Sequence, residues 1–76
     1  TALRVDEGRI SAESKQIGKS LEECVPLHSS GIVLLSIKRN GAHEFNPRPK
    51  TTIQSGDILI VIGNPEQINE VRSEIN

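Results

Sequence analysis

The chain has 76 residues, a formal net charge of −1 and Phe45 as its single aromatic residue. This length allows one small domain with an aliphatic core, and the composition, 34% hydrophobic and 25% charged, argues against a disordered chain. The balanced charge and the single aromatic residue argue against nucleic-acid binding. The lone Cys24 excludes an internal disulfide and fits a reducing cytosol. The longest apolar run, residues 58–62, is too short to cross a bilayer.

The first part of the chain reads as extended, because apolar and polar residues alternate from residue 3 to residue 13. The phase of this alternation changes across Gly8, which predicts a bulge or a tight turn at that glycine. Residues 1–9 are therefore interpreted as the end of a linker or a first strand, and residues 10–76 as the domain proper.

A short helix is predicted next. Ser20 and Glu23 have the spacing of a capping box, in which the two residues satisfy each other's amides at a helix start. Pro26 lacks an amide donor and is expected to end this helix. Residues 28–31 then read as a loop.

Two runs of β-branched and aliphatic residues, 32–37 and 58–62, predict central strands that are buried on both faces. Asn40-Gly41 is a strong hairpin signal, so residues 42–45 are expected to return as a strand that ends at the following prolines. Residues 51–55 form a further short extended segment before a Gly-Asp turn.

The last element is predicted to be a helix. Asn64 suits the N-cap, Pro65 suits the first helical position, and Gln67 completes a capping box. Three apolar residues then fall on one helical face: Ile68, Val71 and Ile75.

These elements follow in the order β-α-β-β-β-α, which predicts an α+β domain with a mostly antiparallel sheet and two helices. Two strands read as buried on both faces, yet two helices, one of them short, cannot cover both. We therefore expect a second copy of the chain to cover the remaining face, in a homodimer.

The order and spacing of several segments resemble the RCK C-terminal (TrkA-C) domain of proteins that regulate potassium channels and transporters. The resemblance extends from about residue 10 to residue 75. The segments that carry it are residues 14–21, a Ser-x-x-x-Gly-x-x-Leu pattern, 31–41, 45–57, 58–63 and 64–68.

This resemblance implies a cytosolic regulatory domain that pairs with a copy of itself and is attached to a membrane channel or transporter, for potassium or, in some relatives, for carboxylates. In several members of the family the groove between paired copies binds a small ligand, often cyclic di-AMP. No enzymatic activity, metal or other cofactor is implied. The alternative function is a purely structural dimerisation module of such a transporter, without a ligand.

The candidate ligand-binding residues lie around the predicted hairpin. A cyclic dinucleotide needs a cation for phosphate, an amide for a base edge and an apolar platform for a ring. We assign Arg39 to phosphate, Asn46 to hydrogen bonding, and apolar side chains to the ring; the alternative is a solvated hairpin end with ordinary surface charges. The complete set is Ile37, Lys38, Arg39, Asn40, Asn46 and Pro47.

The remaining reactive residue types have simpler interpretations. His28 and His43 lack neighbours at metal-ligand spacing and are interpreted as surface histidines. Cys24 is interpreted as a small buried hydrophobic residue. The sequence contains no recognisable nucleophile–base pair and no glycine-rich phosphate loop, so we do not expect an enzyme.

Overall fold

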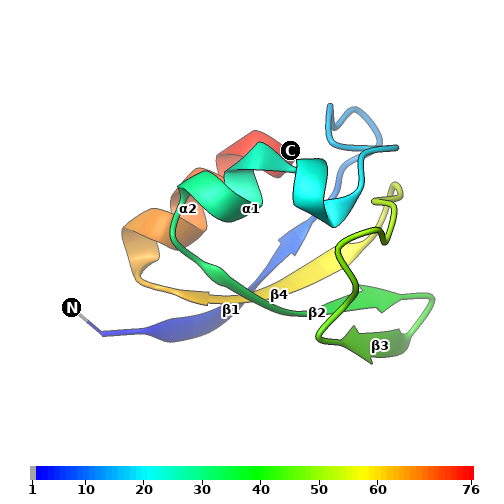
Figure 1. The fold of residues 1–76 in the computed structure, drawn as a ribbon. Coiled ribbons are helices and arrows are strands. Elements are labelled where there is room, and N and C mark those ends of the chain that lie inside the picture. The colour runs from blue at the N-terminus through cyan, green and yellow to red at the C-terminus, as the bar shows by residue number, and fades with distance from the viewer. Residues whose placement is uncertain (1) are drawn as a thin grey trace.

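The computed structural model describes residues 2–76, so Thr1, the first residue of the predicted linker or strand, lies outside the described residues. The chain forms a four-stranded antiparallel sheet with the strand order β1-β4-β2-β3 (Figure 1). This is the predicted α+β fold. Its elements in chain order are β1 (Arg4–Arg9), the 3-10 turn η1 (Leu21–Glu23), α1 (Val25–Ser29), β2 (Val33–Arg39), β3 (Ala42–Phe45), β4 (Ile58–Gly63) and α2 (Pro65–Ile75).

The two aliphatic runs form the inner strands β2 and β4, as predicted, but the chain buries only one of their faces. Leu59 and Val61 of β4 are buried, whereas the alternate residues Ile58, Ile60 and Ile62 are half-buried. Both helices lie on the same side of the sheet (Figure 1). Within residues 2–76, nothing covers the opposite side, which we call the open face.

Strand β2 carries one irregularity. Leu34 pairs with Val61 and Ser36 pairs with Ile60, so the residue between them, Leu35, is left over in a β-bulge. Leu34 therefore faces the helices, and Ser36, only two residues later, faces away from them. The bulge changes which face of β2 each later residue occupies.

The predicted bulge or turn at Gly8 is wrong, because β1 pairs with β4 in one continuous register and Gly8 lies opposite Leu59. Gly8 faces α2 so closely that an added Cβ would lie 2.8 Å from Cδ1 of Ile75. The apolar residues before it, such as Val5, lie on the open face, and Ile10 after it lies in the core. The phase change in the sequence therefore marks a change of face along one strand.

The predicted role of Pro26 is also wrong. Glu23 Oε1 accepts hydrogen bonds from the Ser20 amide and hydroxyl, each at 2.9 Å, so the capping interaction forms, but around a single 3-10 turn. Pro26 lies in the first turn of α1, where its missing N–H leaves no bond unmade. As a result His28 and Ser29, predicted to be loop, are helical.

The other local predictions are confirmed. The hairpin between β2 and β3 turns at Asn40 and Gly41, both with positive φ (52° and 79°). Asn64 Oδ1 accepts a hydrogen bond from the backbone N–H of Gln67, and Gln67 Oε1 accepts one from the backbone N–H of Asn64, each at 2.8 Å. The predicted inner face of α2 is buried, with Ile68, Val71 and Ile75 exposed by 3% or less.

The predicted extended segment at residues 51–55 pairs with the segment just before η1 instead of joining the sheet. Ile53 N donates to Lys19 O at 2.8 Å, and Gly18 N donates to Ile53 O at 2.9 Å. The Ile53 side chain is fully buried. This short pairing closes the end of the core that the helices leave open.

Candidate functional site

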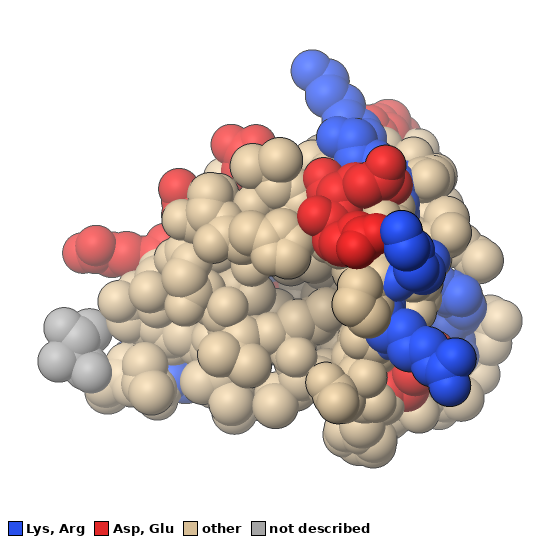
Figure 2. All heavy atoms as spheres, in the orientation of Figure 1, with Lys and Arg blue, Asp and Glu red and all other residues tan. Residues whose placement is uncertain are grey.

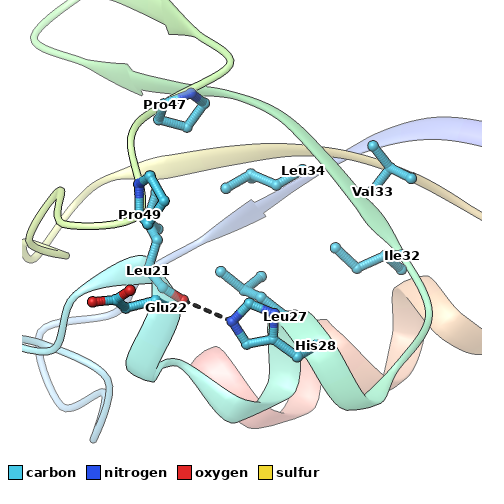
Figure 3. Close-up of a pocket in the computed structure, with 9 residues that line it drawn as sticks. All are labelled: Leu21, Glu22, Leu27, His28, Ile32, Val33, Leu34, Pro47 and Pro49. Atoms are coloured by element: carbon cyan, nitrogen blue, oxygen red, sulfur yellow. Dashed lines mark hydrogen bonds between the residues drawn. The ribbon is translucent and has the colours of Figure 1, made fainter.

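A cavity of about 510 Å³ lies on the helix side of the sheet (Figure 3). It lies between η1 and α1, the first half of β2, and the segment that follows β3. A volume of this size is typical of small-ligand pockets. The residues that line it are Leu21, Glu22, Leu27, His28, Ile32, Val33, Leu34, Pro47 and Pro49.

The walls of this cavity are mostly apolar and rigid. Pro47 and Pro49 lie across from Leu27 and Ile32, with Leu34 between the two sides (Figure 3). Proline rings and branched aliphatic side chains lose little conformational entropy when they contact a ligand. The cavity therefore offers a preformed platform for a flat or apolar group.

Polar groups are confined to one edge of the cavity. His28 Nε2 lies 3.1 Å from Leu21 O and must carry the hydrogen, since a carbonyl oxygen only accepts (Figure 3). The Glu22 carboxylate at the same edge forms an ion pair with Lys50. On this side of the molecule an uncharged expanse covers the region of α1 and β2, bordered by a group of acidic and basic side chains (Figure 2).

Two of the six predicted site residues lie at this cavity or beside it. Pro47 lines it, and Asn46 directly precedes Pro47. Asn46 has a left-handed backbone (φ 48°), and its backbone N–H donates to Leu35 O at 2.9 Å. Asparagine tolerates this conformation better than most residues, so Asn46 both ends β3 and places Pro47 at the cavity.

Arg39 is committed to an interaction that the sequence did not predict. Its Nε and one terminal nitrogen donate to the two carboxylate oxygens of Asp57, both at 2.8 Å, and the same terminal nitrogen donates to Thr52 O at 2.9 Å. Asp57 is 1% exposed and also accepts from the Gln54 amide at 2.9 Å, which confirms its predicted role in the local turn. The hydrogen bonds to Asp57 raise the pKa of Arg39, so the guanidinium remains charged.

The other three predicted residues do not share a surface with the cavity in one copy of the chain. Ile37 is 2% exposed and belongs to the core. Lys38 of β2 pairs with Ile58 of β4 and lies on the open face. Asn40 lies at the tip of the hairpin. The six residues therefore do not form one site within a monomer.

Sequence reasoning missed most of the apolar cavity wall. Pro49 was interpreted only as part of a strand end and Leu21 only as part of a short helix, and Leu27 was given no role. The available signal was the Pro-x-Pro spacing, because residues two apart in an extended segment point to the same side. Nothing in the sequence placed that loop against η1 and α1.

Outside the cavity, the second histidine contacts the only aromatic side chain. His43 stacks on Phe45 with ring centroids 5.5 Å apart, and its Nδ1 lies 3.4 Å from Ser36 Oγ. Among residues 2–76, no three or more His, Cys, Asp and Glu side chains are grouped so as to hold a metal ion. The helices of the same residues include none long and apolar enough to cross a membrane.

Cys24 is fully buried, and this burial raises the pKa of its thiol. Because the thiolate is the reactive form, we expect the native protein to react with a thiol reagent such as DTNB many times more slowly than the urea-unfolded chain does. Absorbance at 412 nm measures both rates. Equal rates at the same pH would contradict the buried position of Cys24.

The chain matches the model of the TrkA-C domain over residues 7–76. No curated protein sequence matches it significantly. Among solved structures, the RCK_C domain dimer of S. agalactiae BusR in complex with c-di-AMP has a TM-score of 0.85 and 25% identity, and the match covers 95% of each chain. The RCK C domain of the potassium transport protein KtrA, in complex with c-di-AMP, has a TM-score of 0.84 and 29% identity, covering 96% of this chain and 84% of that one.

Longer relatives contain the same fold as one part. BusR of S. agalactiae in complex with its busAB-promoter DNA matches with a TM-score of 0.84 and 25% identity, but this chain spans only 35% of that one. The GsuK channel bound to NAD has the same fold at 23% identity, and the match covers 13% of its chain. With 70 of its 76 residues matched to the family model, the chain described here belongs to the TrkA-C domain family.

Proposed function

We propose that this domain is a ligand-sensing regulatory module of a potassium channel or transporter, and that it binds cyclic di-AMP between two copies of the chain. The observation that carries this proposal is the cavity beside Asn46 and Pro47, which is apolar, preformed and open on one side. Two TrkA-C relatives whose solved structures contain c-di-AMP support the choice of ligand.

The symmetry of the ligand supports a dimeric site. Cyclic di-AMP has two adenine rings and two phosphates related by a twofold axis, so a symmetric homodimer offers each half the same surroundings. The cavity of one copy would hold one adenine against Pro47 and Leu34, and Asn46 would hydrogen-bond at its edge. The uncharged expanse on the side of the molecule drawn in Figure 2 suits contact with a second copy.

Arg39 has a different role in this proposal from the one expected from the sequence. Two of its nitrogens are held by Asp57 and Thr52, so any contact with phosphate would use the part of the guanidinium that remains free. Replacing Arg39 would therefore disturb the fold as well as the ligand. A clean test of ligand binding needs a variant at the cavity wall.

We expect cyclic di-AMP to raise the melting temperature of the protein and to bind one molecule per two chains. At a free ligand concentration of 100 Kd, the stabilisation is about 2.7 kcal/mol, which corresponds to roughly 10 °C or more for a domain of this size. AMP, which lacks the twofold symmetry, should give a much smaller shift. Circular dichroism and titration calorimetry measure the two quantities.

Pro47→Asp should abolish this shift, because it places a carboxylate at the cavity wall, where it repels the ligand phosphates. Ser55→Asp is the matched control, since it adds the same charge at an exposed turn that does not line the cavity. If wild-type protein forms a tight dimer and every nucleotide titration is flat, the purely structural dimerisation module is the correct function. An equal loss of binding in both variants would remove the cavity from the proposal.

The regulatory response would follow from linkage. A ligand that binds the paired copies in one relative orientation favours that orientation, and an attached channel or transporter experiences the bias. We propose a cytosolic position next to that membrane protein, without insertion into the bilayer.

A further inference from the structure

The side chains on the open face of the sheet change from apolar to basic along the strands. Residues that pair directly across antiparallel strands lie on the same face, so the register defines three cross-strand rows. The apolar row is Val5, Ile62 and Val33; the middle row is Glu7, Ile60, Ser36 and Phe45; the basic row is Arg9, Ile58, Lys38 and His43.

The apolar side chains at the edges of this face are largely exposed. Val5 is 63% exposed, Val33 58% and Phe45 73%, and the isoleucines of β4 between them are only half-buried. They adjoin one another across three paired strands and the edge strand β3. Contiguous exposed apolar side chains of this kind mark an interaction surface.

The charges of the open face are unbalanced, although the whole chain is nearly neutral. Arg9 and Lys38 lie in one row on either side of Ile58, and neither has an ion-pair partner within residues 2–76. Glu7 is the one carboxylate among the three rows. The face therefore has a net positive charge at one end and none at the other.

A second copy of the chain, which the sequence led us to expect on this face, is a poor match for it. A twofold axis along the strands would place the basic row of one copy over the basic row of the other. A twofold axis across the strands would place the basic row over the apolar row. Either arrangement leaves cations facing cations or buried against aliphatic side chains, which is unfavourable.

On its other face, the same sheet is covered by an amphipathic helix, α2. There α2 packs Ile68, Val71 and Ile75 on the sheet, and at the edge Arg72 pairs with Asp6 at 3.6 Å. We propose that the open face docks an acidic amphipathic helix of a partner protein, with apolar side chains over the apolar row and carboxylates on Arg9 and Lys38. The proposed ligand cavity lies on the helix side of the sheet, and Val33 is the one residue of the three rows that also lines it.

A peptide helix suits the face better than nucleic acid or a lipid surface. Two permanent cations and one phenylalanine are few for tracking and stacking a nucleic-acid strand, and aliphatic rows do not stack on bases. An anionic membrane would attract the basic row, but Arg9 and Lys38 are only two cations, where lipid-binding clusters carry about four to eight. Both remain outcomes of the test below.

The test uses two blocked 18-residue helical peptides with leucines on one face and either glutamates or lysines on the other. With isotope-labelled protein, we expect the acidic peptide to shift amide resonances of the three rows and to bind about tenfold more tightly than the lysine peptide. The double variant Arg9→Glu/Lys38→Glu should reverse this preference. The control Lys15→Glu/Arg48→Glu, which makes the same change in net charge at exposed sites off this face, should keep it.

The proposal fails if neither peptide binds, if both bind equally, or if the control variant loses the preference as fully as the open-face variant does. It also fails if phosphatidylglycerol vesicles or an oligothymidine shift the same resonances while the peptides do not. Binding of cyclic di-AMP can be measured on each variant, so a failure here leaves the proposed ligand function standing.

Discussion

Arg39→Ala is expected to lower the free energy of unfolding by about 3 kcal/mol, because it leaves the buried Asp57 carboxylate without its partner. The Asp57 side chain is 1% exposed and the Arg39 side chain 33% exposed. We therefore take the low end of the destabilisation usually caused by breaking a buried ion pair. A domain of this size has only about 5 kcal/mol of stability in total. The variant should therefore melt roughly 15 °C lower. The chain lacks Trp and Tyr, so urea unfolding is best followed by far-ultraviolet circular dichroism.

Two further variants make this prediction specific. Arg39→Lys keeps the charge but cannot form both hydrogen bonds to Asp57, so it should fall between wild type and Arg39→Ala. Lys50→Ala breaks the exposed ion pair with Glu22 and should leave the urea midpoint almost unchanged. If Arg39→Ala is no more harmful than Lys50→Ala, the Arg39–Asp57 pair does not stabilise the fold.

Ile53→Ala is expected to cost about 3 kcal/mol, through lost burial and the cavity it leaves. Ile53 is fully buried although it lies outside the sheet and both helices. Its backbone joins residues 51–53 to residues 18–21 by hydrogen bonds to Gly18 and Lys19. Its loss should therefore loosen this end of the core before the sheet itself unfolds.

Hydrogen exchange distinguishes that local effect from uniform destabilisation. In Ile53→Ala, the amides of Gly18 and Leu21 should lose more protection than those of β4. Val25→Ala is the control, because Val25 is 66% exposed in one copy and its truncation should change the stability of the monomer little. Equal effects of the two alanine substitutions would show that the Ile53 anchor is not important.

The elements of the fold were predictable because their signals are local. Asn40-Gly41 requires positive φ, and the Asn64–Gln67 capping box needs only its own residues, so both were correct. Gly8 and Pro26 were misinterpreted because their roles depend on distant or alternative partners. Gly8 makes room for Ile75 on α2, and Pro26 begins a helix as readily as it ends one.

The site was predicted less completely, for a similar reason. Residues near the hairpin were grouped by their nearness in sequence, but strand alternation sends Lys38 to the open face and buries Ile37. The Arg39–Asp57 pair spans 18 residues, and a lone Gly-Asp turn gave no sign of it. Of the predicted residues Pro47 lines the cavity, while the opposite wall of the cavity depends on how η1 packs.

The bulge in β2 gives the two sides of the sheet a short mechanical connection. Leu34 borders the cavity, and Ser36 pairs with Phe45 across β2 and β3 on the opposite side. The Leu35 carbonyl between them accepts a hydrogen bond from the backbone N–H of Asn46, which precedes Pro47. Filling the cavity would press on one end of this three-residue stretch. Because the hydrogen-bond ladder is locally disrupted at a bulge, we expect a nucleotide in the cavity to change the affinity of the open face for a docked helix.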